Sequence, residues 1–317
     1  MSLLCFQSAK RNELKPLAFV IITYNRPQDM LALARNIARL EGAEELLEEV
    51  VVLNNASTED YSVVEAYMRS ETRIPFRYIE SSVNLGVSRG RNRAIHESTA
   101  PFLIMLDDDA ELRDADSLKR LLPQFDQGFQ GRPVAVVSFK VLYHETGEMQ
   151  RNAFPHKKYE KYVGLSAFPT SYYAGGAHAV RREAMEKAGL YPEDFFYGME
   201  EYDMAYRLVD AGYAIMYSDS VVMLHKESPK GRQPKREKMR MMWVNKSIVA
   251  WRYLPIRHFL STAFLWSMEY LRKSSFDLVG WFEGWRRVLG IPYTQRRTPV
   301  SSAALQYLSS VEARLSH

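Results

Sequence analysis

The chain has 317 residues, of which 46% are hydrophobic and 25% charged, and its formal net charge is +4. This composition is typical of a globular protein with a sizeable core, and a single cysteine, Cys5, excludes an internal disulfide and favours a reducing, cytoplasmic setting. The opening residues show no charged segment followed by an apolar stretch, so we expect no secretory leader.

Short apolar runs alternate with helical patterns through the first half of the chain. Residues 17–23 are rich in β-branched side chains and predict a buried strand, and Pro27 opens an amphipathic helical pattern. The alternation continues with strands at 50–53, 76–79 and 102–106 and helices at 61–69 and 87–97. It predicts an α/β fold with a mostly parallel sheet, covered by helices on both faces.

The second half of the chain is less regular. It contains strand patterns at 135–139, 214–217 and 221–224, helical patterns at 183–188 and 200–211, and a tight backbone passage at Gly175 and Gly176. Beyond Pro234 the chain becomes helical and aromatic. We therefore divide it into an α/β domain at 1–225 and a helical C-terminal segment at 226–317.

Three consecutive carboxylates, Asp107, Asp108 and Asp109, follow the strand at 102–106. Ligands bind beyond the carboxyl ends of the strands in such sheets, and three adjacent carboxylates are costly unless a cation neutralises them. Mg²⁺ or Mn²⁺ would take oxygen ligands here and keep positions open for phosphates. A solvated turn, or an N-cap cluster ahead of a helix at 114–122, is the alternative interpretation of the triplet.

Four segments carry a resemblance to a known family. In order and spacing, residues 19–26, 51–58, 84–92 and 106–109 resemble the family 2 glycosyltransferases, and the resemblance extends over about residues 19–225. It implies a GT-A fold, which is Rossmann-like with a mostly parallel central sheet. It also implies a UDP- or dTDP-sugar donor, a divalent metal and inversion at the sugar carbon.

The resemblance assigns a set of polar residues at the strand ends to the donor. The nucleotide-sugar-binding residues would be Thr23, Tyr24, Asn25, Arg26, Asn54, Asn55, Asn84, Arg91, Asn92, Asp107 and Asp108. Asp109, Asp107 and His225 would hold the metal. Many relatives have an Asp at the position of Asn54, whose amide still accepts a hydrogen bond but adds no charge. The base in the donor therefore stays open.

An acidic pair, Glu200 and Glu201, begins the helix predicted at 200–211. The surrounding segment is similar to the family's acceptor-side segment, in which the second acidic residue is the base that takes the acceptor's proton. That position is Glu201 here, where an Asp is usual, and the longer side chain leaves Glu200 as the alternative. The pair could instead only cap the helix, together with Asp203. For His178 we expect packing rather than a contact with the acceptor.

The C-terminal segment is basic. Residues 226–297 contain 16 Lys and Arg against 5 Asp and Glu, whereas the rest of the chain contains 26 against 33. The segment therefore favours an anionic partner, such as a membrane surface or a phosphorylated acceptor, and no nucleic-acid module accompanies the charge. Its interrupting charges argue against a spanning helix. Two interpretations fit this segment. It could contact the inner face of a membrane peripherally, or it could form a helical pair that packs on the catalytic domain or on a second subunit.

The sequence thus predicts a metal-dependent, inverting hexosyltransferase-type enzyme that transfers a sugar to a saccharide or lipid-linked acceptor in polysaccharide or glycoconjugate synthesis. The tail is similar to those of bacterial rhamnosyltransferases. A sugar nucleotidyltransferase is one alternative, but it would need a glycine-rich phosphate loop where this chain has residues 23–27. A non-catalytic nucleotide-sugar-binding protein on the same fold is the other.

Overall fold

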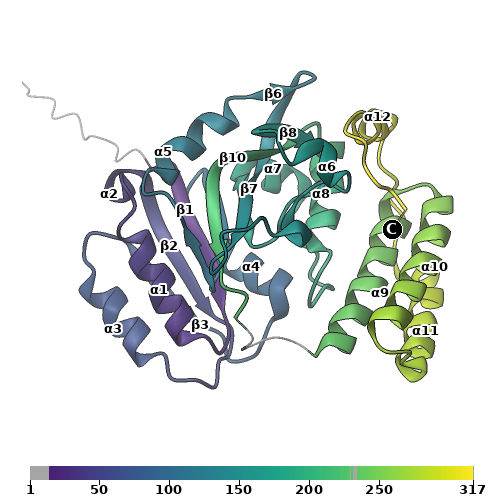
Figure 1. Ribbon diagram of the computed structural model, residues 1–317, viewed down its shortest axis with the longest axis horizontal. Coiled ribbons are helices and arrows are strands. Elements are labelled where there is room, and N and C mark those ends of the chain that lie inside the picture. The colour runs from purple at the N-terminus through teal and green to yellow at the C-terminus, as the bar shows by residue number, and fades with distance from the viewer. Residues whose placement is uncertain (1–13, 229, 231–233, 317) are drawn as a thin grey trace, which may run out of the picture.

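The computed structural model describes residues 14–228, 230 and 234–316. Cys5, and the opening residues on which the expectation about a leader rests, lie outside this range. The described chain forms one ten-stranded mixed sheet flanked by helices, followed by a group of C-terminal helices to one side (Figure 1).

The strands are β1 (Leu17–Thr23), β2 (Leu47–Asn54), β3 (Phe76–Glu80), β4 (Phe102–Asp107), β5 (Ala110–Leu112), β6 (Gly128–Phe129), β7 (Arg132–Tyr143), β8 (Ala167–Thr170), β9 (Ala177–Arg181) and β10 (Ala214–His225). The helices are α1 (Pro27–Ile37), α2 (Ala43–Leu46), α3 (Ser62–Ser70), α4 (Gly86–His96), α5 (Ser117–Leu121), α6 (Tyr159–Tyr162), α7 (Arg182–Ala188), α8 (Glu200–Asp210), α9 (Lys235–Tyr253), α10 (Ile256–Lys273), α11 (Leu278–Thr294) and α12 (Ser302–Ser310). Two short 3₁₀ turns, η1 (Leu122–Phe125) and η2 (Arg151–Ala153), complete them.

The sheet runs in the order β3-β2-β1-β4-β9-β7-β10-β5. The first four strands are parallel, as the strand–helix alternation predicts. β9 runs antiparallel to both β4 and β7, and β10 returns to the parallel direction beside β7. The polar segments that follow β1, β2 and β4 therefore leave the sheet on the same side, at the carboxyl ends of these strands.

Alternate side chains of β1 enter two separate cores, as the two-residue period of a strand requires. Phe19 and Ile21 pack with α1 and α3 on one face. Ala18 and Val20 pack on the other face, in a core that continues through α4 and α8 into the C-terminal helices. The sheet is thus covered on both faces, which confirms the expected α/β architecture.

One sequence-based expectation and one alternative interpretation are wrong. The strands expected at 214–217 and 221–224 are one strand, β10, whose register with β7 shifts between Ser218 and Val222. The acidic triplet does not cap a helix, because β5 begins at Ala110, directly after Asp109, and α5 begins only at Ser117. β9 was not predicted because it is short and buried along most of its length, so it shows no alternating pattern.

The C-terminal helices pack against the sheet domain through α9 and α12. Trp243 of α9 is fully buried and donates its indole N–H to the carbonyl of Ala263 in α10. Gly284 brings α11 against the ring of Trp243 so closely that a Cβ there would overlap it. In the described part of the chain, none of these helices combines the length and the apolar character that crossing a membrane requires.

Gly284→Ala should therefore destabilise the fold. A methyl group would collide with Trp243 and force α11 away from α9, which costs about 1–3 kcal/mol for an overpacked core. Chemical denaturation measures the loss.

Gly290→Ala is the matched control in the same helix. A Cβ at this position would meet none of the described atoms within 4 Å, so the substitution should leave stability unchanged or raise it by about 0.5–1 kcal/mol through helix propensity. Equal stability of both variants would contradict this packing of α11 on α9.

Candidate functional site

The acidic triplet lies at the turn between β4 and β5, and its three carboxylates have different surroundings. Asp107 ends β4 and its side chain is 41% exposed. Asp108 and Asp109 are buried. Gly176 passes so close to Asp107 that a Cβ at this position would overlap the carboxylate. The tight backbone passage expected at Gly175 and Gly176 therefore lies beside the triplet.

Asp108 is held by the segment that follows β1. Its carboxylate accepts hydrogen bonds from the Thr23 hydroxyl at 2.7 Å and from the Arg26 guanidinium at 2.7 Å. Because the Thr23 proton goes to Asp108, the Tyr61 hydroxyl, 2.6 Å away, donates to Thr23 and itself accepts from the Arg26 backbone N–H. Burial raises the pKa of Asp108 to about 6, although Arg26 and Thr23 act in the opposite direction.

Asp109 faces His225, which ends β10. The Asp109 Oδ1 atom lies 3.3 Å from His225 Nε2 and, within the described residues, has no hydrogen-bond partner. Asp109 Oδ2 accepts from the Ser228 backbone N–H at 2.8 Å. Burial would raise the pKa of Asp109, but His225, Arg26 and the Ser228 amide outweigh it and lower that pKa.

Gln150 orients the His225 ring. Its side-chain oxygen lies 2.8 Å from His225 Nδ1 and accepts the proton there, while its amide donates to Glu227. The Nε2 atom then faces Asp109, and in the neutral ring it is the nitrogen available to a metal ion. A histidine that metal ions bind through one nitrogen is usually held in this way at the other.

Asp107, Asp109 and His225 form a cluster with the composition of a metal site. One ligand atom from each lies within 4.8 Å of the others. A buried carboxylate oxygen without a hydrogen bond normally costs free energy. The oxygen and nitrogen donor set, the unpaired Asp109 Oδ1 and the oriented Nε2 together fit a divalent cation such as Mn²⁺ or Mg²⁺.

Arg26 closes this cluster on the side of the β10–α9 connection. Its Nη1 atom lies 3.3 Å from Asp109 Oδ2, in addition to its bond with Asp108. Its Nε and Nη2 atoms donate to the carbonyls of Lys230 and Ser228. Arg26 therefore joins the end of β1 to the chain segment that leaves His225.

Four asparagines build the shell around the ends of β1 and β2. Asn25 has a left-handed backbone (φ 57°), and its side-chain oxygen accepts from the Thr58 and Glu59 amides. Asn54 accepts from the Ser57 amide and donates to the Tyr78 hydroxyl. Asn55 accepts from the Leu85 amide and donates to Asn84 and to the Gly86 carbonyl. These side chains fix the loops around the strand ends, and their contacts with a donor stay a prediction.

Arg91 of α4 links the triplet to the acidic pair of α8. Its guanidinium lies 3.4 Å from Glu200, 3.2 Å from Glu201 and 3.8 Å from Asp107, and it donates to the Gly175 carbonyl at 2.9 Å. Burial raises the pKa of Glu200 and the neighbouring Glu201 raises it further, while Arg91 acts against both. Glu200 is buried, whereas the side chain of Glu201 is 16% exposed.

The turn before α8 sets the direction of the acidic pair. Gly198 and Met199 both have left-handed backbones, with φ of 81° and 73°. Asn245 of α9 donates to the carbonyls of Tyr197 and Gly198. A C-terminal helix thus holds the turn from which Glu200 and Glu201 project.

Two residues that the sequence analysis discussed, Asn92 and His178, are hydrogen-bonded to other parts of the fold. Asn92 binds the Tyr191 backbone in both directions, accepting from its N–H at 3.0 Å and donating to its carbonyl at 2.9 Å. His178 is buried between the Ala174 carbonyl and the Tyr191 hydroxyl, and burial together with the charge of Arg91 lowers its pKa to about 3. His178 is therefore a packed, neutral imidazole, as expected, and the donor contact assigned to Asn92 stays a prediction.

Several of the site's supporting residues carry no signal in the sequence. Gln150 and Tyr61 belong to no motif, and Tyr191 and Ser228 act here largely through their backbones. Only their tertiary contacts with distant segments identify these residues as parts of the site.

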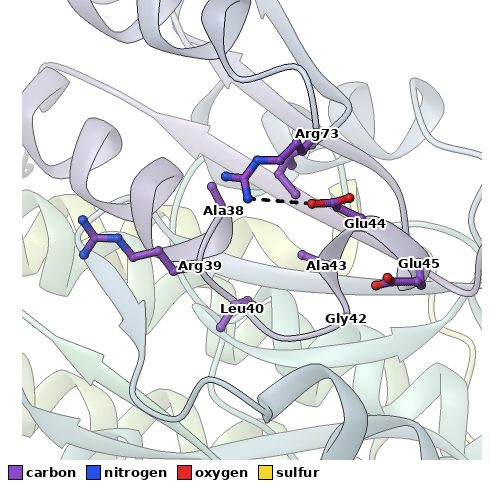
Figure 2. Close-up of a pocket in the computed structure, with 9 residues that line it drawn as sticks. Ala38, Arg39, Leu40, Gly42, Ala43, Glu44, Glu45 and Arg73 are labelled. Carbon is purple, nitrogen blue, oxygen red and sulfur yellow. Dashed lines mark ion pairs between the residues drawn. The ribbon is translucent and has the colours of Figure 1, made fainter.

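A separate hollow of about 430 Å³ lies near the amino ends of β2 and β3, and Figure 2 shows the residues that line it. It is formed by the loop after α1, by α2 and by the turn before β3, and Glu44 and Arg73 face each other across it at 3.7 Å. Both side chains are more than half exposed. None of the described residues that line it is a buried polar group, and the triplet is not among them. We therefore place the candidate site at the carboxyl ends of the strands.

The sequence and the fold of this chain are similar to those of known proteins. The sequence profile of Glycosyl transferase family 2 matches residues 18–189, more than half of the chain. An uncharacterised protein of Haemophilus influenzae is 26% identical over 178 residues, which cover 56% of this chain and 92% of that protein. Hyaluronan synthase of Pasteurella multocida is 26% identical over 258 residues, which cover 69% of this chain but only 26% of the synthase.

Solved structures share the fold. S. aureus TarS in complex with UDP-GlcNAc has a TM-score of 0.63 at 13% identity, covering 87% of this chain and 81% of the TarS chain. The mannosyltransferase PcManGT of Pyrobaculum calidifontis, in complex with GDP-Man and Mn²⁺, has a TM-score of 0.54 at 17% identity, covering 95% and 76%. These likenesses confirm the expected GT-A-like fold with C-terminal helices.

Proposed function

This chain belongs to glycosyl transferase family 2, and we propose that it is an inverting, metal-dependent enzyme that moves a sugar from a UDP- or dTDP-linked donor to an acceptor hydroxyl. The observation that carries the proposal is the cluster of Asp107, Asp109 and His225 at the carboxyl ends of the strands, with one buried carboxylate oxygen unpaired among the described residues. The Mn²⁺ named with the PcManGT structure supports the choice of ion.

Asp107, Asp109 and His225 would hold the ion beside the donor. Bound there, a divalent cation supplies positive charge to the diphosphate that leaves. Asp108 keeps Thr23 and Arg26 in place and so orients the segment that follows β1. Arg26 and Arg91 border the same carboxylates and add fixed positive charge next to the departing phosphates.

Glu201 is the base in this proposal. Burial favours the protonated form of Glu200, whose Oε2 atom has no partner within the described residues. Glu201 is the more exposed member of the pair, and Arg91 holds its carboxylate at 3.2 Å. Glu201 would take the proton of the acceptor hydroxyl as that oxygen attacks the anomeric carbon.

The outer face of α10 and α11 is the contact that we propose with a membrane surface. These helices lie farthest from the sheet (Figure 1). Their exposed apolar side chains, with those of the turn between them, are Ile256, Leu260, Phe264, Leu265, Met268, Phe276, Leu278, Val279, Phe282, Leu289 and Tyr293. The surrounding segment carries the chain's excess of Lys and Arg. Apolar side chains among basic residues suit an anionic bilayer surface.

Asp109→Asn tests the metal site. The neutral amide removes charge from the centre of the cluster, so Mn²⁺ should raise the melting temperature of the wild type but not of the variant. Release of UDP or dTDP from the donor should fall by about 100-fold or more.

Asp114→Asn is the control, because this carboxylate is paired with Arg113 and Arg120 away from the cluster. It should respond to Mn²⁺ as the wild type does. Full activity of Asp109→Asn at low Mn²⁺ would show that the cluster does not hold the ion.

Glu201→Gln tests the base. The amide keeps the size and polarity of the side chain but cannot accept a proton, so donor affinity should stay within about twofold while transfer falls by roughly 100-fold or more. Calorimetry with the donor and a transfer assay separate the two quantities. Normal transfer by Glu201→Gln, with loss in Glu200→Gln, would instead identify Glu200 as the base.

Val279→Ser tests the membrane contact, and it is best combined with Phe282→Ser. The double variant should sediment less with phosphatidylglycerol vesicles than the wild type does, and neither protein should sediment with neutral phosphatidylcholine vesicles.

Val63→Ser provides the control, since Val63 of α3 is also an exposed valine, at 61% against 82% for Val279. It should sediment like the wild type. Unchanged sedimentation of the double variant, or a shift only in its oligomeric mass, would refute the membrane contact.

A further inference from the structure

A cluster of three basic side chains lies where the C-terminal helices meet the sheet domain. Lys246 comes from α9, Lys157 from the segment before α6 and Arg314 from the segment after α12. Lys246 is only 4% exposed. Burying a charged ammonium group is expensive unless an opposite charge or several hydrogen bonds compensate it.

Lys246 has no such compensation within the described residues. Neither a hydrogen bond nor an ion pair connects its ammonium group to them, and its neighbour is the face of the Tyr202 ring, whose centroid is 3.0 Å from Nζ. Burial lowers the pKa of Lys246 well below its ordinary value, and the charges of Lys157 and Arg314 lower it further. The charges of Lys157 and Arg314 therefore repel the ammonium group of Lys246.

The other two basic groups have no carboxylate partner in the described chain either. The pKa of Lys157 is lowered by burial and then by the charges of Arg314 and Lys273, and no acidic residue offsets them. The carboxylate of Glu312 is bound by Lys158 and Lys161 instead. The exposed Arg314 adds positive charge that acts on both Lys246 and Lys157, and no carboxylate of the described residues pairs with any of the three.

Two stacked tyrosines form the floor of the cluster. The rings of Tyr172 and Tyr202 lie 4.7 Å apart with an interplanar angle of 17°. Lys246 faces Tyr202, and Lys157 lies 5.9 Å from the centroid of Tyr172. The aromatic faces make the cationic groups tolerable in the absence of an anion.

The cluster adjoins the proposed base. Tyr202 follows Glu201 in α8; burial raises the pKa of the Tyr202 hydroxyl, and the charge of Glu201 adds to that effect. Gly175, close to Tyr172 in the chain, approaches Glu201 so closely that a Cβ there would overlap its carboxylate. A group bound by the three basic residues would thus lie near Glu201, the proposed base, and so on the acceptor side of the proposed reaction.

We propose that Lys246, Lys157 and Arg314 bind a phosphate group of the acceptor, so that this protein glycosylates a phosphate-bearing acceptor rather than a neutral saccharide. The inference rests on the proposed glycosyltransferase function. The phosphate takes no part in bond making. It holds the acceptor with one sugar hydroxyl toward Glu201, and its charge compensates the buried ammonium group of Lys246.

Binding of phosphate probes to the full chain tests the proposal without an assay of transfer. Calorimetry in EDTA, with inorganic pyrophosphate and with farnesyl diphosphate as probes, keeps divalent ions out of the donor site. Lys246→Met should weaken the binding of both by about tenfold or more, because a charge-assisted contact is lost. The same variant should be at least as stable as the wild type, since a buried unpaired charge becomes an apolar side chain of similar size.

Two control variants show whether the phosphate probe binds at the basic cluster. Asp109→Asn should bind pyrophosphate like the wild type, because the donor site is not involved. Lys119→Gln should also behave like the wild type, because Lys119 pairs with Glu41 on a distant surface. Much tighter binding of farnesyl diphosphate than of pyrophosphate would identify a lipid-linked phosphate, and equal binding a water-soluble phosphate ester.

Absence of binding to the wild type, or equal affinity in Lys246→Met and the wild type, would overturn the proposal. Neither result would bear on donor binding, which is measured separately with Mn²⁺ and a nucleotide sugar. Failure of the phosphate site and failure of the transferase function are therefore distinguishable.

Discussion

The structure depends on an excess of negative charge at the carboxyl ends of the parallel strands. Five carboxylates, those of Asp107 to Asp109 and of Glu200 and Glu201, share the guanidinium groups of Arg26 and Arg91. Because most of these groups are buried, their mutual repulsion is weakly screened. A divalent cation, held in part by the neutral imidazole of His225, would supply the missing positive charge. The loops around the strand ends and the turn before α8 hold the carboxylates in this unfavourable proximity.

Much of this arrangement could be predicted from the sequence, because a parallel sheet collects the ends of its strands at one edge. The strands that lead to Thr23, Asn54 and Asp107 follow from short apolar runs, and the pairing of β1 with β2 and β4 brings those ends together. His225 was predictable only through the family resemblance. A lone histidine gives no such signal by itself, and this one lies far from the acidic triplet in the chain.

The remaining features depend on tertiary contacts that no local pattern encodes. Gln150 orients His225 across 75 residues, and Asn245 holds the turn before α8 from a C-terminal helix. β5, directly after the triplet, was missed because three residues are too few to show a period. The tail, which composition divides from the rest of the chain, shares a hydrophobic core with α8. The tail therefore helps to build the site. We propose that the boundary near residue 225 separates two structural parts of the chain that serve the same function.

The location of the metal tests the account most directly. A crystal grown with Mn²⁺ and a UDP- or dTDP-sugar should show one anomalous peak in the site, within about 2.5 Å of carboxylate oxygens of Asp107 or Asp109 and of His225 Nε2. The donor's diphosphate should complete its coordination. A bound donor with no peak at this cluster, or with the ion held by other residues, would contradict the account.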